Sequence, residues 1–267
     1  MQQDRRTTAL RNAFAHPEGK ESPLVILLSL LTWFEIVMCF ILFFPFQFAL
    51  FILTAPFDRR RRIMHYHSSL WCALALALGP LWKVELQGKE HLDRKKPHVV
   101  IMNHQSLIDV LIAFRLFYPV KMIGKMALAF VPIVGWNLFL SGHIMVDRKK
   151  IKSQFSAIRR MEKMMKSGDS ILVFPEGTRT RDGEIGEYKK GAFKSASSTG
   201  TALLPVVIDG PYQILPKKGF ILNERKNIII RILPPIPVAV GDKPEELARK
   251  SRQIMADELR RIRSGRS

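Results

Sequence analysis

The chain has 267 residues and 47% of them are hydrophobic, which is enough apolar material for a complete core. Lysine and arginine outnumber aspartate and glutamate by 42 to 23, so the formal net charge is +19 at pH 7. This excess predicts a polyanionic neighbour, such as a nucleic acid, an anionic membrane surface or a phosphorylated ligand. Cys39 and Cys72 lie in apolar runs without CxxC spacing, which excludes a disulfide framework or a cysteine metal site and indicates a reducing compartment.

A long apolar run dominates the first part of the chain. Residues 1–22 are polar and of mixed charge, and we expect them to form a loose segment. Residues 23–57 carry a single charge, Glu35, and 24–44 alone would make about 30 Å of helix, so we expect a membrane element. The run lacks the small-residue cleavage site of a signal peptide. The basic cluster at 58–62 should stay on the cytoplasmic side, beside anionic headgroups.

Two geometries fit residues 23–57. One is a single spanning helix, and the other is a hairpin of two helices that breaks at Pro45 and inserts into one leaflet. A carboxylate is costly at mid-bilayer, so Glu35 favours the hairpin, which would hold it nearer the surface. The remaining alternative is a buried core helix, for which the run is unusually long.

Beyond the apolar run, the pattern changes to strands and helices in alternation. Residues 58–81 form the connection, a basic stretch followed by an apolar helix from residue 64 that ends at Gly79. The expected strands are 82–87, 98–103, 119–123, 143–146, 170–174, 203–208 and 227–233. The expected helices are 106–117, 152–166, 189–199 and 244–263.

This alternation predicts a single mixed α/β domain over residues 82–267. Apolar runs such as 98–102 are continuous rather than alternating, which indicates strands that are covered on both faces. The expected fold is therefore a largely covered central sheet of about seven strands flanked by helices. An N-terminal membrane-embedded helical element precedes it.

A His-x4-Asp spacing joins His104 to Asp109 between a strand-like and a helix-like run. On an ideal helix five residues turn the chain by about 500°, so the two side chains would point about 140° apart. They meet only if His104 lies in the turn before the helix and Asp109 in its first turn, with Ser106 as the N-cap. Asp109 would then hold one imidazole nitrogen while the other removes a proton from a nucleophile. The simpler alternative is that Asp109 only caps the helix.

The attacking group is expected to be a substrate hydroxyl, because the sequence contains no GxSxG nucleophile elbow. This favours direct transfer over a covalent intermediate. Further along, 174–179 follows another strand-like run and carries Glu176, Gly177 and Arg179. A guanidinium in such a loop matches an anionic substrate. Taken alone, Arg179 could equally be an ordinary surface arginine.

These motifs resemble those of a known family. The sequences NHQSLID at 103–109 and FPEGTR at 174–179 are similar to the first and third motifs of the glycerolipid acyltransferases, above all the lysophosphatidate acyltransferases. The segment that begins at Lys125 resembles the second motif and 204–206 the fourth, so the resemblance covers roughly residues 82–235. It implies transfer of a fatty acyl group from a thioester to the 2-hydroxyl of 1-acyl-sn-glycerol 3-phosphate, giving phosphatidate.

The resemblance also implies roles for the motif residues. His104 would deprotonate the acceptor hydroxyl with the help of Asp109. Glu176 would hold the acceptor's free hydroxyl or orient a neighbouring basic residue, and Gly177 would let its loop approach the ligand closely. The implied phosphate ligands are Lys125, Arg179 and, more weakly, Arg148.

The stretch 126–140 is apolar without strand alternation. It could be buried core, the wall of an acyl-chain groove, or a segment that dips into lipid with its tryptophan at the interface. The groove candidates are Phe130, Pro132, Gly135 and Trp136. Met126 and Ala127 stand where many relatives carry a more polar pair, which leaves acyl-length selection open.

No tightly bound cofactor and no metal are expected, because the seven histidines are scattered. The expected partners are a lysophospholipid, an anionic membrane surface, and either acyl-CoA or an acyl-carrier protein as donor. No nucleic acid is expected, since no recognised motif accompanies the charge. The expected location is the inner (cytoplasmic) membrane, with the catalytic domain on its cytoplasmic face.

Two rival functions remain open. The same chemistry could act on another acceptor, either glycerol 3-phosphate or a lyso-aminolipid without phosphate. More remotely, the chain could be a non-catalytic basic peripheral membrane protein, whose charge serves only lipid adhesion.

Overall fold

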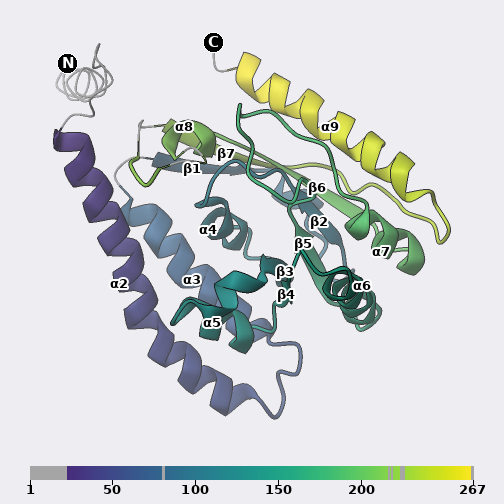
Figure 1. The fold of residues 1–267 in the computed structure, drawn as a ribbon, viewed down its shortest axis with the longest axis horizontal. Helices are drawn as coiled ribbons and strands as arrows, with labels where there is room; N and C mark the ends of the chain where they lie inside the picture. Colours follow the sequence, from purple (N-terminus) through teal and green to yellow (C-terminus); the bar gives the residue numbers. More distant parts are fainter. Residues whose placement is uncertain (1–22, 80–81, 216, 218, 223–225, 266–267) are drawn as a thin grey trace.

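The computed structural model describes residues 23–79, 82–215, 217, 219–222 and 226–265 (Figure 1). The expected loose segment, 1–22, lies outside the described residues. A central sheet has helices on both faces, and a long helical pair, α2 and α3, lies along one side of the molecule (Figure 1).

The sheet has seven strands in the order β1-β7-β6-β2-β5-β3-β4. They are β1 (Trp82–Gln87), β2 (Val99–Met102), β3 (Val120–Lys125), β4 (Ile144–Val146), β5 (Ser170–Val173), β6 (Leu203–Asp209) and β7 (Lys226–Ile232). Strands β6, β2, β5, β3 and β4 run parallel, whereas β7 is antiparallel to β6 and parallel to β1. The expected mixed α/β fold is confirmed.

The strands are covered on both faces because successive side chains point in opposite directions. In β2, Val100 and Met102 belong to one apolar core, and Val99 and Ile101 belong to the other. The first core is closed by α3 (Arg62–Leu78), α4 (Asp109–Phe114) and α8 (Pro211–Ile214). The second is closed by α6 (Ile151–Lys166), α7 (Gly191–Thr199) and α9 (Pro244–Ser264).

Helix α2 (Pro23–Thr54) is one continuous helix that passes through Pro45. The hairpin favoured from the sequence is therefore not formed. Glu35 lies within the continuous helix, so its charge did not impose a break. A proline inside an apolar helix is tolerated where a neighbouring helix supports it, and α3 packs along α2. One polar side chain secures the pair, since Gln47 of α2 bonds to Ser141 and accepts from Ser68 of α3.

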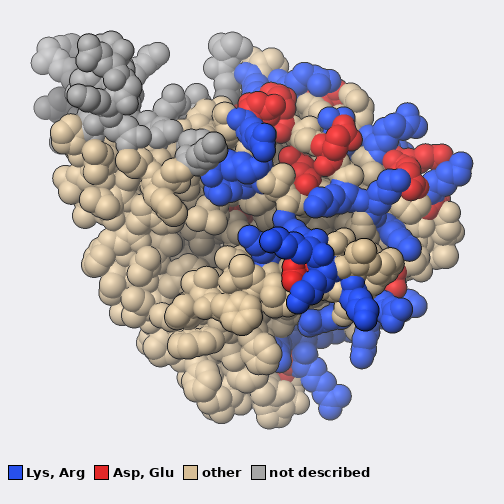
Figure 2. Space-filling model, in the orientation of Figure 1, with Lys and Arg blue, Asp and Glu red and all other residues tan. Residues whose placement is uncertain are grey.

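Most of the α2 surface faces outward. Its buried residues recur every three or four positions and form a single narrow stripe, which includes Val25, Ser29, Thr32, Ile36 and Cys39. The remaining faces expose large apolar side chains along the whole helix. Among the described residues, α2 is the one helix that is long and apolar enough to cross a membrane. Figure 2 shows an almost uncharged surface over α2 and α5 (Val134–Leu140), with lysine and arginine gathered over α6, α7 and α9.

Candidate active site

The motif residues follow the carboxyl ends of neighbouring parallel strands. His104 comes just after β2 and Glu176 just after β5, and Lys125 is the last residue of β3. Arg148 follows β4. Because β2, β5, β3 and β4 run parallel, their carboxyl ends lie at the same edge of the sheet, where open α/β sheets bind their ligands.

His104 and Asp109 form a hydrogen-bonded pair at this edge. Nδ1 of His104 lies 2.7 Å from Oδ2 of Asp109. The His104 side chain is 19% exposed and that of Asp109 is fully buried. The imidazole stacks on the ring of Phe174, with 4.2 Å between the ring centroids. Nε2 of His104 makes no hydrogen bond within the described part of the chain, so it is the nitrogen that can meet a substrate.

Asp109 is held by the backbone as well as by the imidazole. Its Oδ2 accepts hydrogen bonds from the backbone N–H groups of Gln105 and Ser106, at 2.6 and 2.8 Å. Burial raises the pKa of Asp109, and the hydrogen bonds from His104 and the backbone oppose that rise. The expected N-cap at Ser106 is wrong, since α4 begins at Asp109 and the Ser106 hydroxyl donates to Leu215 O instead. The two backbone donors lie before α4, so Asp109 does not cap the helix and the capping alternative is wrong.

Glu176 holds the backbone of the loop that carries His104. One carboxylate oxygen accepts from the N–H of His104 at 2.9 Å and the other from the N–H of Gly186 at 3.1 Å. Burial raises the pKa of Glu176, while these two backbone donors lower it. This placement differs from both roles foreseen for Glu176, because its oxygens are directed at backbone donors rather than at a ligand or a basic side chain.

The loop 174–179 brings several cations together. Gly177 has φ +69°, a left-handed conformation that glycine adopts without strain, and its carbonyl accepts from the Arg148 guanidinium. Lys217 donates to the Thr178 hydroxyl at 2.8 Å and to Arg179 O at 3.0 Å. The half-buried Arg179 side chain makes no polar contact within the described residues, so its guanidinium remains free for a ligand.

The comparisons with known proteins agree with this geometry. Residues 83–209 match the family model described as Acyltransferase. A 1-acyl-sn-glycerol-3-phosphate acyltransferase of Chlamydomonas reinhardtii is 33% identical over 78% of this chain and 62% of that protein. The chain belongs to the acyltransferase family. The 1-acyl-sn-glycerol-3-phosphate acyltransferase of Saccharomyces cerevisiae is 36% identical over 67% of this chain and 60% of that protein, so the chain spans about three fifths of these relatives.

A bacterial relative and a solved structure extend this similarity. The 1-acyl-sn-glycerol-3-phosphate acyltransferase of Pseudomonas aeruginosa is 28% identical over 75% of this chain and 77% of that protein. The crystal structure of the 1-acyl-sn-glycerophosphate acyltransferase of Thermotoga maritima superposes with a TM-score of 0.77 at 24% identity. It covers 89% of this chain and 95% of that chain, which shows that the acyltransferase fold is shared.

The other acyltransferase candidates are dispersed around the edge. Lys125 is exposed and contacts none of the loop residues among the described side chains. Phe130 and Trp136 are 81% and 55% exposed, so the buried-core alternative is wrong for both. Trp136 lies against Phe44 of α2, with 5.7 Å between the centroids. Pro132 is also exposed, whereas Gly135 is buried where any side chain would collide with the Ala129 carbonyl.

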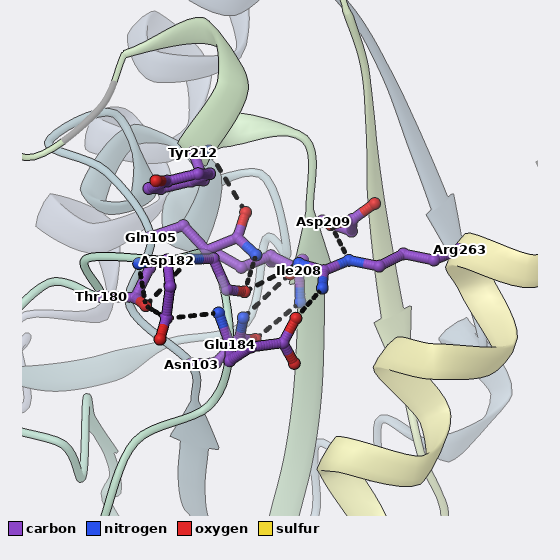
Figure 3. Close-up of polar contacts among 10 residues, drawn as sticks. Asn103, Gln105, Thr180, Asp182, Glu184, Ile208, Asp209, Tyr212 and Arg263 are labelled. Carbon is purple, nitrogen blue, oxygen red and sulfur yellow. Dashed lines mark hydrogen bonds and ion pairs between the residues drawn. The ribbon is translucent and has the colours of Figure 1, made fainter.

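Sequence reasoning missed the polar residues that fix the acyltransferase loops. Asn103 exchanges two hydrogen bonds with the backbone of Ile208 in β6, at 2.9 and 2.8 Å (Figure 3). Gln105 accepts from Tyr212 N and donates to Gly183 O. The signal was present for these two, because they flank His104 in the motif. Their partners lie 105 and 78 residues away along the chain, and only the fold brings them close. Lys217 lies outside the four motifs, so the sequence gave no signal for its contacts with the loop.

Proposed function

We propose that this acyltransferase moves a fatty acyl group from a coenzyme A or acyl-carrier-protein thioester to the 2-hydroxyl of 1-acyl-sn-glycerol 3-phosphate, giving phosphatidate. The observation that carries the proposal is the buried Asp109 carboxylate on Nδ1 of His104, with Nε2 left for a substrate. The names of the relatives support the choice of acceptor.

In the proposed reaction His104 acts as a general base. Nε2 takes the proton of the acceptor hydroxyl as its oxygen attacks the thioester carbonyl, while Asp109 stabilises the resulting imidazolium. The C–O bond forms and the C–S bond breaks as the tetrahedral intermediate collapses. The imidazolium then gives its proton to the departing thiolate, which restores the neutral base.

The acceptor phosphate needs cationic partners beside the base. Arg179 is the strongest candidate, because its guanidinium is unengaged and belongs to the loop that also holds Glu176. Arg148 is a second candidate, since its contact with Gly177 O places its guanidinium against the same loop. Lys125 stays a proposal that rests only on its place at the end of β3.

We further propose that α2 embeds in the inner membrane and that the catalytic edge faces the cytoplasm. The outward apolar side chains of α2 support this, together with the exposed Phe130 and with Trp136, which lies against α2. The four arginines at 59–62, which follow α2, would then lie next to anionic headgroups. No tightly bound cofactor is proposed.

The test is a transfer assay with the purified full chain in lipid vesicles. Radiolabelled acyl-CoA and acyl-carrier protein are each offered with lysophosphatidate, glycerol 3-phosphate and a lyso-aminolipid. The proposal predicts labelled phosphatidate from lysophosphatidate and at least tenfold slower transfer to the other two acceptors. Equal rates with the acceptor that lacks phosphate would contradict the choice of substrate, and no transfer at all would leave the non-catalytic rival.

A further inference from the structure

Helix α9 carries two arginines on one side. Arg252 and Arg263 are eleven residues apart, which on an α-helix is about 1,100°, close to three complete turns. They therefore project in nearly the same direction, separated by about 16 Å along the axis. Buried Met255, Leu259 and Ile262 anchor the helix on the second core.

Arg263 contacts three groups of the body at once (Figure 3). Its Nε lies 3.1 Å from Oδ1 of Asp209, whose side chain is 2% exposed at the end of β6. Another nitrogen, Nη2, donates to Gly183 O at 2.8 Å, and Nη1 pairs with Glu184. The planar guanidinium fork thus joins α9 to both the sheet and the segment 183–184.

Arg252 holds the next part of the same segment. Its Nε donates to Gly186 O at 2.9 Å and its Nη2 to Ile185 O at 3.3 Å. Glu187 adds an exposed ion pair at 3.3 Å. Together the two arginines donate to three backbone carbonyls of this segment, those of Gly183, Ile185 and Gly186.

The inner side of this segment holds the histidine loop. The peptide between Ile185 and Gly186 is bound at both ends, because its oxygen accepts from Arg252 and its N–H donates to Glu176. The other oxygen of Glu176 accepts from the N–H of His104. A hydrogen-bonded chain therefore runs from α9 to the catalytic histidine, and such chains strengthen each bond by polarising the next.

Two further bonds connect the same segment with the histidine loop. The N–H of Thr180 donates to His104 O at 2.8 Å. Gln105 donates to Gly183 O at 3.4 Å, so that this carbonyl is shared between Gln105 and Arg263. The segment 180–187 therefore lies between α9 and the histidine loop and bonds to both.

We propose that Arg252 and Arg263 are positioning residues, which hold the segment 180–187 so that Glu176 keeps the His104–Asp109 pair in its reactive geometry. The kinetic test of this inference rests on the proposed function, because it measures acyl transfer. It assigns the carboxy-terminal helix a part in catalysis, although none of its residues reaches the base. The competing account is that the arginines only dock α9 on the body.

The experiment compares Arg252→Ala, Arg263→Ala and Arg263→Lys with Arg260→Ala. Arg260 is the matched control, because it lies on the same helix and, among the described residues, its ion pair is with Asp257 of that helix alone. Each variant is measured for kcat, for acceptor KM, for thermal midpoint and for amide hydrogen exchange of peptides covering 103–109 and 180–188. A misplacement of about 1 Å at a reacting group costs up to about 100-fold in rate, so the alanine variants should lose about tenfold in kcat.

The proposal expects unchanged acceptor KM, and faster exchange in both peptides, for Arg252→Ala and Arg263→Ala but not for Arg260→Ala. Arg263→Lys should have an intermediate kcat and intermediate exchange rates, since an ammonium keeps the charge but not the planar arrangement of donors. This variant also allows the test if an alanine variant unfolds. Wild-type kcat in both alanine variants would overturn the proposal, as would exchange at the wild-type rate in the peptide that covers 103–109. Hydrogen exchange needs no substrate, so it tests the link between α9 and His104 even if the wild type fails to acylate lysophosphatidate. That failure would count against the proposed function alone.

Discussion

At the residue scale, one carboxylate oxygen organises the site. Oδ2 of Asp109 accepts from two backbone N–H groups and from the imidazole, so it shapes the loop and orients the base at the same time. Its other oxygen is buried and has no partner within the described residues. A buried charge with an unsatisfied oxygen is costly to stability, and such sites are typical of function rather than of packing.

Asp109→Asn should therefore separate catalysis from folding. An amide oxygen in the place of Oδ2 can still accept the hydrogen bonds from both backbone N–H groups and from Nδ1, but it carries no negative charge to stabilise the imidazolium. We expect kcat to fall by about 10²–10⁴-fold, with a thermal midpoint no lower than that of the wild type, because burial disfavours the charge that is removed. Turnover within a few-fold of wild type would show that the carboxylate does not support the base.

Arg179→Ala should act on acceptor binding. Loss of a charge-assisted bond to phosphate is expected to raise the acceptor KM by about tenfold, since such bonds contribute about 1.5–3 kcal/mol. Lys166→Ala, at the exposed end of α6, is the control for loss of one positive charge. Steady-state kinetics over a range of lysophosphatidate concentrations distinguish the two, and equal KM values would remove Arg179 from the phosphate site.

At the element scale, the sequence predicted what local patterns determine. All seven strands and the main helices follow from apolar runs and turn residues, because both sheet faces are buried. The pairing of His104 with Asp109 also followed from spacing, once the turn before α4 was assumed. The continuity of α2 through Pro45 did not, because it depends on packing against α3. The contacts of Glu176 did not follow from the sequence either. Its partner Gly186 lies in an irregular loop, whose position no periodic pattern predicts.

The packing of α3 on α4 predicts a pH dependence of stability. His65 of α3 is buried against Phe114, and burial lowers its pKa to about 3, with the nearby Lys121 charge adding to the effect. An unfolded chain binds a proton there below about pH 6.5, whereas the folded chain does so only near pH 3. The free energy of unfolding should therefore fall as the pH drops from about 6.5 towards 3, by up to about 1.4 kcal/mol per pH unit from this group.

His65→Gln should flatten that slope, because the amide does not titrate. Unfolding midpoints in detergent at several pH values between about 7 and 4 measure it. His91→Gln, on the surface near β1, is the matched control and should keep the wild-type slope. Parallel curves for His65→Gln and the wild type would contradict the assignment.

At the scale of the whole molecule, apolar and charged surfaces are separated. Figure 2 shows the uncharged surface over α2 and α5 and the basic surface over α6, α7 and α9. The sequence predicted both ingredients but not their arrangement, which depends on which side of the sheet each helix covers. The exposed side chain of Trp136 lies against Phe44 of α2, so it continues the surface of that helix and enlarges the area that can enter lipid.

This arrangement predicts attachment by apolar contact rather than by charge. The chain should stay with zwitterionic vesicles in flotation at about 1 M salt, where charge attraction is screened beyond about 3 Å. Brominated lipids should quench Trp136 and Trp33 of α2, so Trp136→Phe should lose part of the quenching, while Trp82→Phe, which alters a buried residue, should lose none. Release of the chain from the vesicles by salt would contradict this prediction and would indicate that net charge alone holds the protein on the membrane.

The whole account depends on His104 as the base, and the most direct measurement is the initial rate of acyl transfer to lysophosphatidate by His104→Ala. The side chain is only partly buried and its backbone bonds to Glu176 and Thr180 do not need the imidazole, so the variant should fold and bind vesicles as the wild type does. The account predicts a rate lower by about 10²–10⁴-fold. A folded, vesicle-bound variant that keeps more than about 10% of the wild-type rate would contradict it.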